Sequence, residues 1–200
     1  AIRDGEFDAF KNLYPRVSDQ TDDLLIEVAG RPGVVGGNMT LILLAAVERF
    51  SPEAYLTACK RAVETGDSWR VQTLVKESEG RLSEPLPSLH GEVILYAYTN
   101  NCRNIAKDLI AQCTPEQIAS VPPKLLRWVA EKLDFQTAVD LVDKGVRPGD
   151  EVVGILRTLT GQHQEWMAER LLEHGMPVEP DNYDALYACV SNQVADIISY

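Results

Sequence analysis

The stretch AVDLVDKGVRPGDEVVGILRTLTGQHQEWMAERLLEHG covers residues 138–175 and decides the fold, because its two ends repeat each other. The opening AVDLVDKG (138–145) returns as AERLLEHG (168–175). Each copy has a small residue followed three positions later by two apolar residues, a spacing that places all three on one face of an α-helix. Each copy then ends on Gly, which suits the left-handed residue that closes many helices. One helix therefore recurs, and the sequence between the copies supplies the rest of a repeat.

The same pattern extends outward in both directions along the chain. Successive copies are 29 to 35 residues apart, and their first residues are Met39, Val71, Ala106, Ala138, Ala168 and Ile197. Another apolar segment precedes each copy, separated from it by a polar corner such as TGD (65–67) or TNNC (99–102). Segments with Pro or Gly connect the pairs, and strict alternation of apolar and polar residues persists nowhere. The sequence therefore predicts an all-α chain of helical hairpins.

We expect a single helical-repeat domain over residues 1–200, as a fragment of a longer protein. It would hold an atypical N-terminal helix and six hairpins, at residues 1–20 and then 21–50, 51–78, 89–113, 122–145, 149–175 and 181–200. The last hairpin is incomplete, because the helix that begins near Ile197 stops about one turn short at Tyr200. A short helix depends on packing against its neighbour. We therefore expect the natural chain to continue with an apolar residue and a Gly-containing turn, and residues 192–200 to fray.

The segment LLEHGMPVEPDNYDALYACVSNQVADIISY (171–200) resembles a junction between ankyrin repeats. LLEHG matches the Leu-Leu-x-x-Gly helix end of that family, and Ala185 with Leu186 matches the opening of its next helix. The family's Thr-Pro-Leu-His opening is absent, and the hairpins before residue 120 match in spacing more than in residues. HEAT-like hairpins therefore stay an alternative for the N-terminal half. The resemblance implies a solenoid of about six degenerate ankyrin-like hairpins, with a concave face that binds other proteins.

Composition and charge exclude several classes of protein. Hydrophobic residues make up 45% of the chain and charged residues 24%, as in folded globular proteins. The most apolar stretch, residues 39–47, is too short to span a bilayer. A net charge of −11 disfavours nucleic acid and anionic membranes as partners. The four cysteines form no CxxC pair and the chain opens without a signal-peptide pattern, so we expect an intracellular, cytoplasmic protein.

No arrangement of residues points to catalysis or to a bound cofactor. His90, His163 and His174 lie in no zinc-binding spacing, and no GxSxG motif is present. The Gly-rich segment GRPGVVGGN (30–38) lacks the Lys followed by Ser or Thr of a phosphate-binding loop, so we expect it to be a flexible link between helices. We therefore expect neither an enzyme nor a cofactor nor a metal. The alternative is a helical enzyme, or the regulatory region of a larger multidomain enzyme.

The expected function is a protein-interaction scaffold that binds through its concave face and its inter-repeat loops. The candidate contact residues are tyrosines near the first helices of two hairpins and a run of glutamates: Tyr96, Tyr98, Tyr183, Tyr187, Glu165, Glu169 and Glu173. Like charges four residues apart slightly destabilise a helix. Residues 151–200 hold eight acidic and two basic side chains, which would suit a partner with a basic patch or simply keep the chain soluble. The oligomeric state stays open.

Two tryptophans occupy one position of the repeat. Trp69 and Trp166 each lie two residues before a repeat anchor, at Val71 and Ala168. A large ring at a shared position favours packing between repeats. If exposed, the same rings would be anchors for a partner, because Trp is enriched at interface hot spots. We expect packing.

Overall fold

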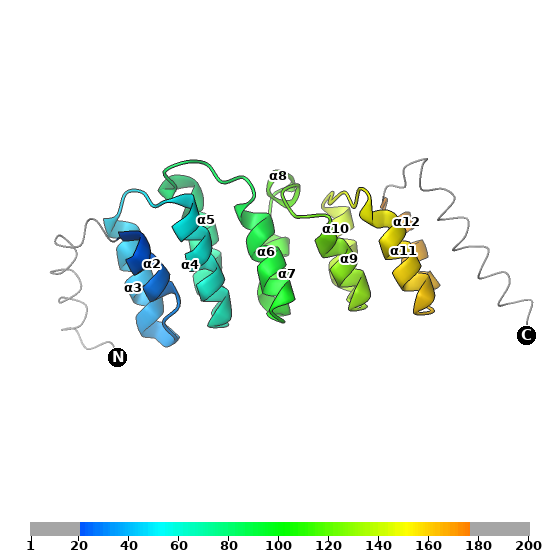
Figure 1. Cartoon of the computed structure of the whole chain (residues 1–200), viewed down its shortest axis with the longest axis horizontal. Helices are drawn as coiled ribbons and strands as arrows, with labels where there is room; N and C mark the ends of the chain where they lie inside the picture. Colours follow the sequence, from blue (N-terminus) through cyan, green and yellow to red (C-terminus); the bar gives the residue numbers. More distant parts are fainter. Residues whose placement is uncertain (1–20, 177–200) are drawn as a thin grey trace, which may run out of the picture. The chain divides into compact units, whose positions relative to one another are not determined.

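The computed structural model describes residues 21–176, apart from the side chain of Glu165, and this range is all-α (Figure 1). It contains no strand, and the nearest feature to one is an isolated parallel bridge between Phe50 and Leu82. The prediction of an all-α chain is confirmed. The expectations for residues 1–20 and 181–200 lie outside the described range.

The helices follow one another in a regular order. They are α2 (Thr21–Ala29), α3 (Gly33–Ala46), α4 (Pro52–Glu64), α5 (Ser68–Arg81), α6 (Leu89–Thr99), α7 (Arg103–Gln112), α8 (Pro115–Ile118), α9 (Lys124–Glu131), α10 (Phe135–Asp143), α11 (Glu151–Gly161) and α12 (Glu165–Glu173). None of these helices of residues 21–176 combines the length and the apolar character needed to cross a membrane. The chain divides into two compact units, Ala1–Leu109 and Ile110–Tyr200, with α7 across the boundary.

In the first unit, helices that hold the same place in successive hairpins pack on each other. The first helices form the series α2, α4 and α6, and the second helices α3 and α5 also pack together. Figure 1 shows these helices as neighbouring pairs. The repeat anchors lie in the core between them, with Val71 and Leu74 fully buried and Val75 5% exposed. The apolar period of three and four residues is therefore the buried face of α5. In α3 the expected anchor Met39 is only half-buried, and the buried face instead comprises Gly36, Gly37, Thr40, Leu43 and Leu44.

The second unit repeats this arrangement. Helix α9 packs on α10 and α11, and α12 packs on α10 and α11. Its anchors Ala138, Leu141 and Leu171 are buried, with no exposed surface, and Ala168 is 7% exposed. The two hairpins that share the motif quoted at the start are thus built on the same core positions.

The corners inside the hairpins show why the helices end where they do. Gly66 and Asn101 have positive φ angles of 72° and 62°, as their residue types predict. Asp67 and Asp134 then cap the following helices, because their carboxylates accept hydrogen bonds from the backbone N–H groups three residues later. The polar corners therefore stop one helix and start the next.

Two other corners reach the same backbone shape without Gly or Asn. Leu133 and His163 have φ angles of 53° and 55°. In each corner the next residue donates its N–H to a carbonyl five positions earlier, from Asp134 to Val129 at 3.1 Å and from Gln164 to Leu159 at 2.8 Å. These bonds satisfy carbonyls at the helix end whatever the side chain. A left-handed Leu costs about 1–2 kcal/mol, so its residue type did not predict this backbone conformation.

The expectation of a flexible link over residues 30–38 is wrong. Helix α3 already begins at Gly33, so the link shrinks to three residues, 30–32. The cause is Arg70, which is fully buried and donates to the carbonyl oxygens of Ala29 at 2.8 Å, Arg31 at 2.6 Å and Gly33 at 2.9 Å. Asp67 pairs with the same guanidinium at 3.0 Å. Three hydrogen bonds from one buried cation therefore fix the turn that leads into α3, and Asp67 at the start of α5 pairs with that cation.

Gly36 and Gly37 of α3 lie where neighbouring groups approach the helix backbone closely. A Cβ on Gly36 would lie 2.9 Å from the carbonyl carbon of Arg31 and still closer to its oxygen. A Cβ on Gly37 would lie at ordinary contact distance, 3.4 Å, from Cζ3 of Trp69. The absence of a side chain at Gly36 thus lets the link of residues 30–32 cross close to α3, and Gly37 lies next to the indole ring of Trp69.

The Pro-bearing link of residues 113–123 also contains a helix that the sequence analysis missed. Thr114 and Gln117 form a reciprocal capping box around α8, with Pro115 at its first position. The T-x-x-Q spacing carries this signal in the sequence. Lys144 then donates to the carbonyls of Ala111 and Cys113, at 3.0 and 3.2 Å, so this link is tied to the end of α10.

Candidate interaction surface

The most prominent surface feature of the second unit is the indole of Trp166. Its side chain is 51% exposed although it is held from two sides. Its ring packs on Phe135, with centroids 5.0 Å apart and planes tilted by 57°. Its Nε1 donates to Oε1 of Gln164 at 2.8 Å. A ring fixed in this way offers apolar area to a partner and loses little conformational entropy on binding.

Trp69 holds the equivalent place in the first unit. Each tryptophan is the second residue of the second helix in its hairpin, and each lies against the second helix of the preceding hairpin, Trp69 at Gly37 and Trp166 at Phe135. The expected packing between repeats is therefore present. Trp69 is also 53% exposed, so the packed ring keeps a free face in both units. Packing and exposure, which the sequence offered as alternatives, occur together.

Two of the predicted glutamates lie beside Trp166. Glu169 and Glu173 are exposed and follow it by three and seven residues, a spacing that places them on the same face of α12. Glu173 pairs with Arg170 at 3.0 Å, whereas within residues 21–176 Glu169 has no ion pair. We call Phe135, Trp166, Glu169 and Glu173 the α12 surface. Glu165, the third predicted glutamate, starts α12, and its side chain is outside the described structure.

His174 occupies the structural place that its position near a helix end predicts. It caps the C-terminal end of α12, and its Nδ1 lies 2.8 Å from Oδ1 of Asp143 at the end of α10. The contact joins the last turns of two packed helices.

The predicted tyrosines have other roles. Tyr96 is half-buried and donates from its hydroxyl to Oε1 of Glu64 at 2.6 Å. This hydrogen bond stabilises the carboxylate, so it lowers the pKa of Glu64 and raises that of Tyr96. Lys60 lies 5.7 Å from the same ring. Tyr96 therefore links α6 to α4.

Tyr98 is only 3% exposed, and the guanidinium of Arg103 lies 5.7 Å from its ring. The expectation that Tyr98 contacts a partner is therefore wrong, because its side chain is buried. Residue 98 follows Ile94 by four positions, so both lie on the same face of α6, and that face is buried. Tyr183 and Tyr187 lie outside the described residues.

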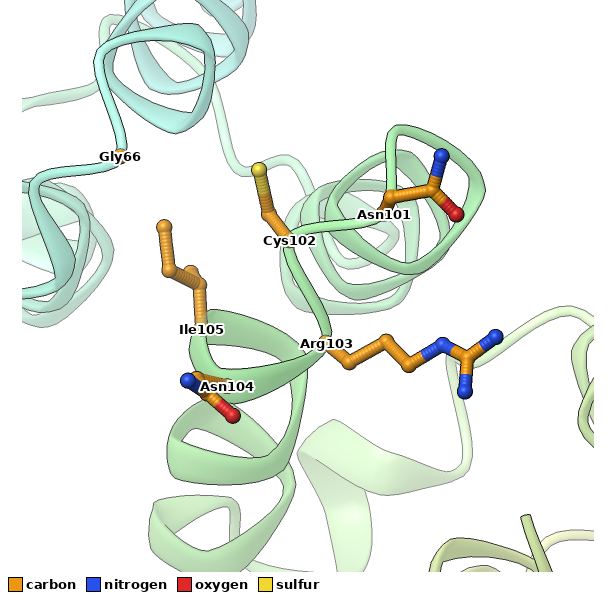
Figure 2. Close-up of a pocket in the computed structure, with 6 residues that line it drawn as sticks. All are labelled: Gly66, Asn101, Cys102, Arg103, Asn104 and Ile105. Carbon is orange, nitrogen blue, oxygen red and sulfur yellow. The ribbon is translucent and has the colours of Figure 1, made fainter.

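A shallow pocket of about 230 Å³ lies in the first unit, where the corner at Gly66 faces the start of α7 (Figure 2). Its lining comprises Gly66, Asn101, Cys102, Arg103, Asn104 and Ile105. Figure 2 shows Cys102 and Ile105 extending toward the Gly66 corner and Arg103 pointing away from it. The lining supplies a thiol and two amides, with no carboxylate or imidazole to activate the thiol.

Sequence reasoning missed Phe135 and Leu133, which is 45% exposed. The signal was the corner KLDF (132–135), where two large apolar residues flank a capping Asp.

Within residues 21–176 no three His, Cys, Asp or Glu side chains gather as a group that could hold a metal ion. Comparison with protein-family models, curated proteins and solved structures gives no match to this chain.

Proposed function

We propose that this chain is a protein-interaction scaffold built from degenerate ankyrin-like hairpins, and that its α12 surface binds a partner protein with a basic patch. The observation that carries the proposal is Trp166, an indole that is held in place and still half-exposed beside Glu169, whose carboxylate has no ion pair within residues 21–176. Tryptophan dominates the hot spots of protein interfaces. The face of an indole also attracts Lys and Arg side chains.

The repeat geometry supports the ankyrin-like part of the proposal. Gly145 and Gly175 end their hairpins with positive φ angles of 94° and 88°. In both, the next residue donates its N–H to a Leu carbonyl five positions earlier at 2.9 Å, from Val146 to Leu141 and from Met176 to Leu171. Two helix ends with the Leu-x-x-x-Gly spacing therefore close in the same way. Stacked repeats commonly present such surfaces to partner proteins.

Charge determines the kind of partner. Glu169 adds to the α12 surface a carboxylate that has no ion pair in the part of the chain that the structure describes, and the whole chain has a net charge of −11. An exposed ion pair contributes little affinity on its own. An acidic surface does raise the rate of association with a basic partner, and salt weakens this effect. The free thiols of Cys59, Cys102 and Cys113 suit a reducing, cytoplasmic setting for this binding.

The test is affinity capture with matched variants. The immobilised chain is exposed to extract from cells that express it, and retained proteins are quantified for wild type, Trp166→Ala, Glu169→Lys and Glu84→Lys. Glu84 lies exposed in the link after α5, so Glu84→Lys makes the same charge change away from α12. We expect a partner retained by wild type and Glu84→Lys and reduced about 10-fold or more by the two α12 variants. Equal retention by all four proteins would refute the proposal.

A further inference from the structure

Helix α3 is apolar around its whole circumference. Its sequence, GVVGGNMTLILLAA, has no charged residue. A helix of this kind in a globular protein is normally buried on all sides. Here one side is buried, through Gly36, Gly37, Thr40, Leu43 and Leu44. On the other side Val34 is 74% exposed, Val35 39% and Leu41 40%.

The exposed side has the spacing of a coiled-coil seam. Val34, Asn38, Leu41 and Ala45 follow one another at intervals of four, three and four residues. This is the a/d spacing that lets two helices pack side by side. Val34, Leu41 and Ala45 are exposed and Asn38 is half-buried. We call these four residues the α3 seam.

Asn38 is the informative member of the α3 seam. Within residues 21–176 its amide makes no hydrogen bond, although it lies in the middle of an apolar stripe. An Asn at one seam position costs stability in a coiled coil but fixes the register and the number of strands, because it pairs with an Asn on the facing helix. A second copy of α3 supplies such an Asn at the same position.

We propose that the α3 seam is a homodimer contact, in which α3 of one copy packs against α3 of a second copy. This goes beyond the proposed binding to the α12 surface and involves the other unit. Two copies of a chain with net charge −11 repel each other over most of their surfaces. Helix α3 itself carries no charge, and Arg31, whose guanidinium contacts Met39 of this helix, is paired with Glu27. Trp69, at Gly37, lies beside the seam and adds apolar area.

The seam sets the strength of the dimer. Helix α3 has 14 residues, which is two heptads, whereas stable coiled coils usually need three or four. Ala45 and the neighbouring Ala46 bury little area, so Val34, Leu41 and Trp69 would supply most of the contact. We therefore expect a dissociation constant on the order of micromolar rather than nanomolar.

Sedimentation velocity on the full chain, from about 1 to 300 µM protein, tests the proposal. Wild type should shift from a monomer of 22.2 kDa toward a dimer as its concentration rises. Leu41→Glu places two like charges in the seam and should raise the dissociation constant about 100-fold or more. The matched control is Leu133→Glu, which makes the same change at a similarly exposed Leu of the other unit and should dimerise like wild type.

A second variant keeps the test valid if Leu41→Glu does not fold. Val34 is the second residue of α3, where a carboxylate favours the helix through its dipole. Val34→Glu should therefore retain the fold and still weaken the dimer about 10-fold or more. A wild type that stays monomeric at 300 µM would overturn the proposal. A dimer that tolerates both Val34→Glu and Leu41→Glu would overturn it too.

Discussion

Replacing Gly36 with Ala tests how Arg70 and the short link fix the start of α3. In a helix interior this substitution normally stabilises, because Ala is a better helix former than Gly by about 1 kcal/mol. Here the new Cβ would overlap the carbonyl group of Arg31, a backbone group that cannot rotate away. That carbonyl also accepts a 2.6 Å hydrogen bond from Arg70. Relieving the overlap therefore disturbs the contacts of a buried cation.

The opposing contributions predict the size of the effect. Forcing an extra methyl group into a packed site costs about 1–3 kcal/mol. Weakening a hydrogen bond from a charged group costs about 1.5–3 kcal/mol more. After the gain in helix propensity, Gly36→Ala should lower the free energy of unfolding by about 1.5–5 kcal/mol. A Cβ on Gly37 would lie 3.4 Å from Cζ3 of Trp69 and 3.8 Å from a guanidinium nitrogen of Arg70, both ordinary contact distances, so Gly37→Ala should be neutral or stabilise by up to about 1 kcal/mol.

Urea unfolding, followed by far-UV circular dichroism and by tryptophan fluorescence, measures both variants. The protein is kept at one low concentration, because association would otherwise add to the apparent stability. Gly36→Ala should unfold at clearly lower urea than wild type, and Gly37→Ala at the same or higher urea. If the two variants stabilise equally, the link does not pass over Gly36 and the account of α3 fails.

Three further perturbations follow from the structure. Arg70→Met removes the buried guanidinium from three carbonyls and a carboxylate and should cost about 3–5 kcal/mol in urea unfolding, so a loss below about 1 kcal/mol would contradict that role. Leu133→Gly relieves a left-handed Leu that is 45% exposed and should stabilise the protein by about 1 kcal/mol in urea unfolding, whereas a loss of stability would contradict this account of the corner. Burial raises the pKa of Cys59 to about 12, so iodoacetamide at pH 8 should alkylate the half-buried Cys102 well before Cys59 in a peptide map. Equal rates at the two thiols would show that α4 opens readily.

Local chemistry made the helices and most corners predictable. Apolar residues at intervals of three and four marked the buried faces, and Gly66 and Asp67 marked a helix end and the next helix start. The start of α3 was not predictable in this way. Its residues 33–38 read as a link because Gly and Asn disfavour helix locally. The interaction that overrides this preference comes from Arg70, more than thirty residues away in sequence.

The candidate surface was predictable only in part. The spacing of Glu169 and Glu173 placed both on one face of α12, and the repeat position of Trp166 predicted its packing. Half-exposure of that ring depends on how far the neighbouring hairpin covers it, which spacing along the chain does not reveal. Tyr98 shows the opposite error, because its place in the first helix of a hairpin suggested a contact position on the concave face, while the packing around α6 buries it.

Photo-crosslinking inside cells tests the central claim most directly, since it reports which surface meets another protein. A benzoylphenylalanine replaces Arg170, which is exposed on α12 four residues after Trp166, or, as the control, Glu84 in the link after α5. We predict a discrete adduct with a different protein from position 170, lost when Trp166→Ala is added, and no such adduct from position 84. The same adducts from both positions, or an adduct at 170 that persists without the indole, would contradict the proposed binding surface.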